Sequence, residues 1–234
     1  MNKKDAVIIL GTAHLGTTPG KQSPDGQLKE AVYSRERVDA IAVKLKAYGY
    51  TVFTDYMPLE PNSYMKSKTA KEEQSKELQY RVNFVNGLCR EYGVENCLYV
   101  SIHVDAAGIG TEWNQAGGFT VYTSKGQTEA DKLAECLYDA AEQNLKEYAE
   151  KMYDGKAKGF YGVNQQPIRT DTTDRDRDRE ADYYVLRKTQ CPAVLTENLF
   201  QDNKCDVDFL LSDAGKHAIE RLHVEGIMRY IEEN

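Results

Sequence analysis

Short apolar runs alternate with segments of helical periodicity along this chain, and this alternation constrains the fold more than any other feature of the sequence. Runs typical of strands lie at Ala6–Leu10, Thr51–Thr54, Leu98–His103, Gly118–Thr123, Tyr184–Arg187 and Ala193–Thr196. Strands that alternate with helices form a largely parallel sheet whose two faces are covered by those helices. The sequence therefore predicts a single α/β domain with a largely parallel, twisted sheet and helices on both faces.

The segments between the strands show the periodicity and the end signals of helices. Apolar residues repeat at helical spacing over residues 38–48 and 78–89, and a glycine follows each stripe. Thr128 and Ser212 each precede a further segment of this kind. Because threonine and serine are favoured N-cap residues, both positions are predicted helix starts.

Composition excludes several classes of partner. The chain has 234 residues and a formal net charge of −7. Nucleic acid is not an expected partner, because phosphate binding depends on clustered lysine and arginine. No apolar run approaches the roughly 20 residues that span a bilayer, so membrane insertion is not expected either.

The N-terminal segment and the cysteines indicate where the chain is made. The segment "MNKKDAVIIL" has too short an apolar run for a signal peptide, and no small-residue cleavage site follows it. The five cysteines include no CxxC pair, which favours reduced and mostly buried thiols. We therefore expect synthesis in a cytoplasm without a signal peptide.

Polar side chains follow or close three of the predicted strands. His14 lies just beyond the first strand, His103 closes the strand that begins at Leu98, and Glu197 follows the run Ala193–Thr196. The carboxyl ends of parallel strands are where sites form in open α/β sheets. A histidine or carboxylate at the end of a buried strand is costly unless it is paired or coordinated.

Two histidines and a carboxylate are a common ligand set for catalytic zinc, and His14, Glu30 and His103 would supply it. Glu197 would remain free to transfer protons. Each residue alone also has a structural interpretation: a hydrogen-bonded histidine, or an acid favoured at a helix start in the case of Glu30. From the residues alone the set is consistent with a metal hydrolase and goes no further.

The two remaining histidines do not extend this set. His217 and His223 lie six residues apart on the last predicted helix, so their side chains diverge widely. Surface or partly buried positions are the expected environment for both.

Four stretches of the chain together resemble the zinc-dependent N-acetylmuramoyl-L-alanine amidases of the amidase-3 type, which include phage endolysins. The first strand leads into "GTAHLG", and Glu30 begins a helix that ends at Gly49. The segments "SIH", ending at His103, and "PAVLTE", ending at Glu197, also match the family. The sequence departs from the family at Ala13, where glycine is usual, and at Asp105, where asparagine is frequent.

The resemblance implies zinc as the cofactor, His14, Glu30 and His103 as its ligands, and Glu197 as the catalytic residue. Glu36 is a competing ligand, but it leaves too short a helix before Gly49. The implied substrate is peptidoglycan, cleaved at the amide between N-acetylmuramic acid and the L-alanine of the stem peptide. The resemblance also implies one catalytic domain over residues 1–234, no separate cell-wall-binding domain, and action at the cell wall after phage-type release.

Two other functions stay open at this point. The chain could be a zinc peptidase that cuts another peptide bond of peptidoglycan, or a non-catalytic module that binds the cell wall. Glu197 argues against the second, because a binding module has no need of a base beside the metal.

The segment "DTTDRDRDREADYY" alternates arginine with aspartate before residue 184. Such a segment is usually a solvated loop whose charges pair with one another, and this is the favoured interpretation. A functional hypothesis is that Arg175 or Arg177 binds the carboxylates of the stem peptide.

Overall fold

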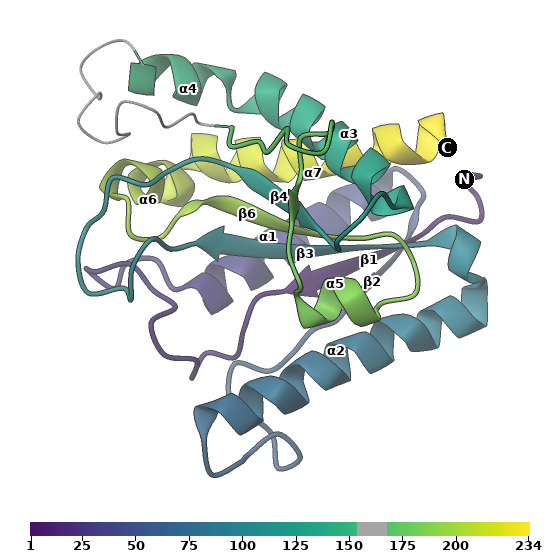
Figure 1. The fold of residues 1–234 in the computed structure, drawn as a ribbon, viewed down its shortest axis with the longest axis horizontal. Helices are drawn as coiled ribbons and strands as arrows, with labels where there is room; N and C mark the ends of the chain where they lie inside the picture. The colour runs from purple at the N-terminus through teal and green to yellow at the C-terminus, as the bar shows by residue number, and fades with distance from the viewer. Residues whose placement is uncertain (154–167) are drawn as a thin grey trace.

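The apolar run at the start of the chain forms a fully buried strand, β1, next to the middle of a six-stranded sheet. The structure is a computed structural model and describes residues 1–153 and 168–234. Its strands are β1 (Val7–Thr12), β2 (Thr51–Thr54), β3 (Cys97–Asp105), β4 (Thr120–Thr123), β5 (Arg179–Glu180) and β6 (Ala193–Phe200). They are ordered β2-β1-β3-β6-β4-β5 across the sheet (Figure 1).

The pairing confirms the largely parallel sheet that the sequence predicts. Strands β2, β1, β3 and β6 run parallel to one another, whereas β4 pairs with β6 in the antiparallel direction. The short β5 runs parallel to β4 at the edge of the sheet. The carboxyl ends of β1, β3 and β6 therefore lie at the same end of the strands. Both chain termini lie toward the opposite end (Figure 1).

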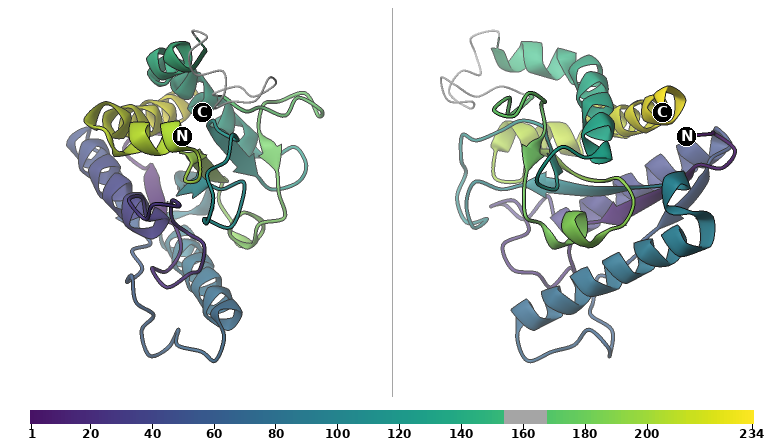
Figure 2. Two further views of the ribbon diagram at one scale, coloured as in Figure 1. Left: turned by 90° about the vertical axis from the view of Figure 1, so that its left-hand side faces the viewer. Right: turned by 45° about the vertical axis from the view of Figure 1, so that its right-hand side comes forward.

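Helices cover both faces of this sheet (Figure 2). They are α1 (Glu30–Ala47), α2 (Ala70–Tyr92), α3 (Glu129–Asn144), α4 (Lys146–Tyr153), α5 (Tyr184–Lys188), α6 (Lys204–Leu211) and α7 (Asp213–Glu233), with the 3₁₀ turn η1 (Val94–Asn96) before β3. The alternation of side chains along β1 separates two cores. Ile8 and Leu10 pack in the larger core with α1, α3 and α7, whereas Val7 and Ile9 pack with α2 and α5.

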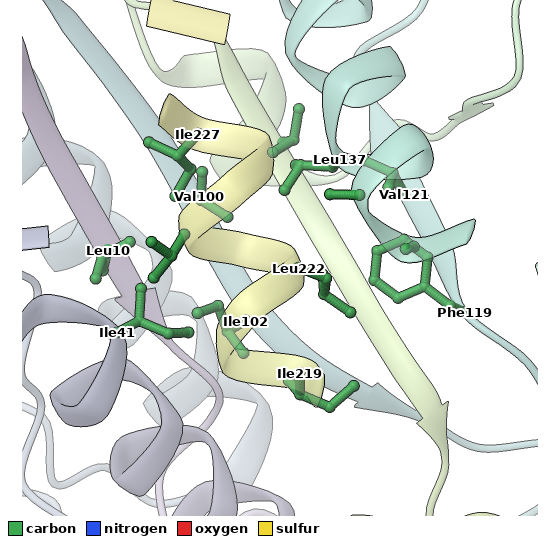
Figure 3. Close-up of a cluster of buried hydrophobic side chains, with 14 of the residues drawn as sticks. Leu10, Ile41, Val100, Ile102, Phe119, Val121, Leu137, Ile219, Leu222 and Ile227 are labelled. Carbon is green, nitrogen blue, oxygen red and sulfur yellow. The ribbon is translucent and has the colours of Figure 1, made fainter. Parts of the chain in front are cut away.

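The larger core is built around α7, which lies between α1 and α3 on the sheet (Figure 3). Ile219, Leu222 and Ile227 of α7 point from this helix into the core and are fully buried. The smaller core is covered by α2, whose first buried residue is Glu77. The first two turns of α2 therefore contribute no buried side chain.

The predicted N-caps are confirmed. The Thr128 side chain accepts from the Ala130 N–H and forms a capping box with Asp131, and the Ser212 side chain accepts from the Gly215 N–H at 3.0 Å. The helix that begins after Thr128 ends at Asn144, and the separate helix α4 follows it.

One predicted strand is wrong. The run Tyr184–Arg187 lies in the helix α5, and the strand before it is the two-residue β5. A short apolar run cannot be assigned by periodicity alone. Here Val185 and Leu186 are buried against α2, a contact that a single helical turn makes as well as a strand.

The cysteines are mostly buried, as predicted, whereas His223 is more deeply buried than predicted. All five cysteines are free, and four of them are buried. His217 is exposed, but His223 is fully buried, contrary to expectation. Its two ring nitrogens lie 2.7 Å from the Ile219 carbonyl and 2.9 Å from the Thr196 hydroxyl, which satisfies both of them. In the described part of the chain, no helix is both long and apolar enough to cross a membrane.

Candidate metal centre and catalytic cleft

His14 lies two residues beyond β1 in a left-handed backbone conformation, with φ of 37°. A residue other than glycine holds this conformation only where its surroundings fix it. The Ser34 hydroxyl of α1 accepts from the Ala13 N–H at 2.8 Å and donates to the Ile102 carbonyl of β3 at 2.6 Å. Ser34 therefore joins the loop before His14 to the strand that carries the second histidine.

Arg35, the next residue of α1, fixes the other side of this loop. Its buried guanidinium donates to the carbonyls of Ala13 and His14, both at 2.9 Å, and to that of Met57 at 3.0 Å. Burial lowers the pKa of Arg35 from its usual value. No pattern in the sequence distinguishes Arg35 or Ser34 from other polar residues of an amphipathic helix, so both were missed by sequence analysis.

Glu30 is the first residue of α1 and lies between the two histidines. Its Oε1 atom is 3.1 Å from His103 Nδ1 and 3.4 Å from His14 Nε2, and the two imidazole rings meet edge to face with centroids 5.1 Å apart. One ligand atom from each of the three residues lies within 4.8 Å of the others. Within residues 1–153 and 168–234 this is the one group of three or more such side chains close enough to hold a metal ion.

The electrostatics of this group fit a cation. Glu30 is fully buried, and its Oε2 atom accepts no hydrogen bond from the described residues, although the Lys21 ammonium lies 3.6 Å from it. Burial opposes the charged form, yet the neighbouring histidines hold the pKa of Glu30 well below its usual value. Burial also lowers the pKa of His103 to about 4, against the opposing effect of Glu30. An ionised carboxylate beside a neutral imidazole is the state in which both residues bind a metal.

Glu197 lies beside this group on the neighbouring strand. It is the register partner of His103, and one residue farther along the two strands lose register in a β-bulge. Its Oε2 atom is buried, and no described residue donates a hydrogen bond to it. Burial, reinforced by the charges of Asp105 and Glu30, raises the pKa of Glu197 well above its usual value.

A second set of contacts holds the ends of β3 and β6. The Asn198 amide donates to the His103 carbonyl at 2.9 Å, and the Val104 N–H donates to Glu30 Oε1 at 3.3 Å. Asp105, at the position where the family often has asparagine, has its carboxylate 3.8 Å from Arg169. Asn198 directly follows Glu197, but its role depends on the bulge and has no signal in the sequence.

His14, His103 and Glu197 line a cavity of about 270 Å³, and the buried Glu30 lies behind the two histidines. Its walls come from Lys21, from α2 and from the segment around α5: Gln74, Glu77, Leu78, Arg81, Tyr183, Tyr184 and Val185. Glu77 is paired with Arg81 at 2.8 Å. Glu197 is therefore the cleft carboxylate that has neither an arginine partner nor a place in the His14, Glu30 and His103 group.

The structure thus brings four of the predicted site residues together and leaves the two arginines elsewhere. Arg177 bonds to three carboxylates of α3: Glu135 at 2.7 Å, Glu142 at 3.0 Å and Asp139 at 2.5 Å. Arg175 is exposed, and neither arginine lines the cleft. Their binding of stem-peptide carboxylates stays a prediction with no contact to support it.

The competing ligand Glu36 lies six residues, about 1.7 turns, farther along α1 than Glu30. It is exposed and lies 3.6 Å from the Arg37 guanidinium, outside the group of ligand atoms. The geometry therefore favours Glu30 over Glu36 as the carboxylate between the histidines.

Comparison with known families agrees with this geometry. The model of the Amidase_3 family, described as N-acetylmuramoyl-L-alanine amidase, matches residues 8–229. The chain belongs to this family. The match covers every element that supplies a residue to the cleft, from β1 to β6.

Two curated relatives show similarity over part or nearly all of the chain. An endolysin of Bacillus phage SPP1 is 33% identical over 132 residues, which are 56% of this chain and 38% of the endolysin. The probable cell wall amidase LytH of Staphylococcus saprophyticus is 26% identical over 98% of this chain and 60% of its own length. The chain therefore spans 60% or less of these two curated relatives.

Solved structures of amidases share the fold. The CwlD amidase from Clostridioides difficile, in complex with the GerS lipoprotein, superposes with a TM-score of 0.71 at 19% identity and covers 98% of this chain and 100% of its own. Ami1 of Mycobacterium smegmatis has a TM-score of 0.67 at 16% identity and covers both chains completely. At these identities the likeness concerns the fold alone.

Proposed function

We propose that this chain is a zinc hydrolase that cleaves the amide bond between N-acetylmuramic acid and the L-alanine of peptidoglycan stem peptides. The observation that carries the proposal is the convergence of His14, Glu30 and His103 beside the unpaired carboxylate of Glu197 in one cleft. Membership of the amidase family supports the bond, and the endolysin and cell wall amidase among its relatives support the substrate.

The donor set suits zinc. Two imidazoles and one carboxylate are a three-ligand set typical of catalytic zinc, in which one position stays open. Zinc bound there supplies a Lewis acid that polarises the scissile carbonyl and acidifies water. The Oε2 atom of the buried Glu30 accepts no hydrogen bond, and the Lys21 ammonium 3.6 Å away shows that this place attracts positive charge.

Glu197 is the residue that moves protons in this proposal. Its carboxylate takes a proton from the attacking water and delivers it to the amine of the leaving L-alanine. Its raised pKa favours the first step, because a carboxylate of higher pKa is a stronger base, and the carboxylic acid so formed is the proton donor for the amine as the C–N bond breaks. Burial and the nearby charge of Asp105 are the physical causes of that rise.

Residues 1–234 are proposed to act as one catalytic domain. All strands in the described part of the chain belong to one sheet, which supports this organisation. The protein acts at the cell wall, where its substrate is, and phage-type release would bring it there. The endolysin among its relatives supports this route.

Digestion of purified peptidoglycan tests the activity. We expect stem peptides with a free N-terminal L-alanine, identified by mass spectrometry, and no product after metal chelation until zinc is restored. Fragments cut at another peptide bond would assign the chain as a zinc peptidase instead. Binding to cell walls without any product would assign it as a binding module.

A further inference from the structure

The alternating acidic loop forms a second polar centre, away from the cleft. Residues 174–180 read Asp-Arg-Asp-Arg-Asp-Arg-Glu, and the structure places them beside the turn between β4 and α3. Thr123, the last residue of β4, lies three residues from Thr120, which is the register partner of Glu197. At the rise of a strand, this separates the loop from Glu197 by about 10 Å along the sheet.

Two aspartates of this loop each have one oxygen that is satisfied and one that is not. Asp178 is 2% exposed, and its Oδ2 accepts from the Thr123 hydroxyl. Asp176 Oδ2 accepts from the Gln127 amide at 2.7 Å. The Oδ1 atoms of both residues are buried, and the described part of the chain supplies no donor to either. A buried carboxylate oxygen without a partner is costly.

The intervening arginines do not neutralise these oxygens. The Arg177 guanidinium turns away to the α3 carboxylates, and Arg175 is exposed. The two aspartates lie within hydrogen-bonding reach of each other, and Asp131 adds a further negative charge. Burial, with the charge of Asp176, raises the pKa of Asp178 to about 7. The Arg179 guanidinium has a buried Nε atom without a partner, and among the described residues neither it nor another arginine or lysine forms an ion pair with Asp176 or Asp178.

We propose that this acidic loop binds a calcium ion between the Oδ1 atoms of Asp176 and Asp178. The two proposed ligand atoms are carboxylate oxygens, and the Thr123 hydroxyl fixes the Asp178 carboxylate through its other oxygen, Oδ2. Calcium accepts carboxylate, hydroxyl, carbonyl and water oxygens in a flexible shell of six to eight. Carboxylate oxygens suit calcium better than zinc, which prefers imidazole and thiolate.

A cation explains the site better than a shared proton does. One proton would bridge the two Oδ1 atoms but would leave the negative charge of the second aspartate beside Asp131 and Glu180. A divalent ion neutralises both carboxylates and joins the loop to the turn after β4. The site would be independent of the cleft, because it shares no residue with the His14, Glu30 and His103 group.

The test measures calcium binding to the whole chain in the presence of one equivalent of zinc. Calorimetric titration with calcium chloride should show one site per chain. Thermal unfolding at a calcium concentration 100 times Kd should shift Tm upward by about 5 to 10 °C. Absence of both heat and shift at millimolar calcium would overturn the proposal.

Two variants locate the site. Asp178→Asn and Asp176→Asn should each weaken calcium binding at least tenfold and abolish the shift in Tm. Asp178→Asn should unfold at the same or a higher temperature than the wild type without calcium, because it removes repulsion between buried carboxylates, so its folding is not in question. If this stabilisation occurs but the wild type binds no calcium, the pair shares a proton and no cation site exists.

Matched controls separate this site from other carboxylates. Asp39→Asn alters an exposed aspartate on α1 and should keep the wild-type affinity and shift. Glu197→Gln should also keep them, because the cleft is not the calcium site. Loss of calcium binding in Glu197→Gln, or its retention in Asp178→Asn, would refute the assignment.

Discussion

His103 of β3 and Glu197 of β6 are register partners on adjacent parallel strands, and both side chains line the cleft. Paired residues on neighbouring strands lie about 5 Å apart. The sheet itself therefore sets the distance between the proposed metal ligand and the proposed proton-transfer group, and no loop has to fold to bring them together.

Glu197→Gln should separate catalysis from metal binding. Glutamine keeps the size of the side chain but cannot accept the proton, so kcat should fall about 10²- to 10⁴-fold. Zinc content should not change, and Tm should stay equal or rise, because the variant removes a buried carboxylate next to Asp105. Turnover of purified muropeptides and metal analysis measure the two effects. A variant that loses its zinc would make Glu197 a ligand.

Glu30→Gln and Glu36→Gln form a matched pair within α1. Wild-type protein should contain about one zinc per chain. Glu30→Gln should lose most of this metal, because Glu30 Oε1 contacts both histidines, whereas the exposed Glu36 contacts only Arg37. Elemental analysis after dialysis distinguishes the two variants. Normal zinc in Glu30→Gln with loss in Glu36→Gln would reverse the ligand assignment.

Ser34→Ala should weaken metal binding without touching a ligand. The change leaves the Ala13 N–H and the Ile102 carbonyl without their partner and frees the backbone of His14. Zinc affinity should fall about 10- to 100-fold, as is typical when the support of a ligand is removed. The unfolding free energy should fall by about 1 to 3 kcal/mol. Competition with a chromogenic chelator measures the affinity, and Ser63→Ala, at an exposed serine, is the control. Unchanged affinity in Ser34→Ala would show that His14 holds its position without this serine.

Arg177→Ala should alter stability and leave substrate binding intact. Its guanidinium joins the loop to three carboxylates of α3, so the unfolding free energy should fall by about 1 kcal/mol. KM for wall fragments should equal that of the wild type. The exposed Arg175→Ala should change neither quantity. A raised KM in either variant would favour the hypothesis that this loop binds the stem peptide.

The stability of the metal-free protein should depend on His223 in acid. Burial lowers the pKa of His223 to about 4, below the value of about 6.5 in an unfolded chain. Between these values the unfolded state binds more protons, so stability falls as the pH decreases from 6.5 to 4, by at most about 1.4 kcal/mol per pH unit for one group. Urea unfolding across this range should give a flatter profile for His223→Gln. His217→Gln, at an exposed histidine, should keep the wild-type profile. Equal slopes in all three proteins would show that His223 does not titrate in this window.

The residues that close strands could be predicted from the sequence, because an apolar run that stops at a polar side chain is a local pattern. His103 and Glu197 follow from that pattern together with the rule that sites form at the carboxyl ends of parallel strands. Glu30 needed the resemblance to a family, since an acid at a helix start has an ordinary electrostatic explanation.

The contacts that hold these residues in place could not be predicted in this way. Arg35 and Ser34 act through backbone groups of a distant loop, and Asn198 acts through a bulge that exists only when β3 and β6 pair. His223 looks like a surface residue until β6 supplies the Thr196 hydroxyl. A strand was expected where α5 lies, because the periodicity of five residues does not distinguish a helix from a strand. The packing of this segment against α2 determines its conformation.

The helix α2 lines the cleft, and its residues are more deeply buried toward its C-terminal end than at its start. From Glu77 onward the helix is held to the sheet by the ion pair of Arg81 with Asp55 at 2.7 Å and by apolar packing, but its first two turns have no buried side chain. Regions with few buried contacts open locally at a free-energy cost far below that of global unfolding. The outer part of this wall can therefore fray and re-form while β1, β3 and β6 keep the metal ligands and Glu197 in register. The sheet thus keeps the proposed catalytic residues fixed, while the start of α2 can yield to a large substrate such as the proposed peptidoglycan.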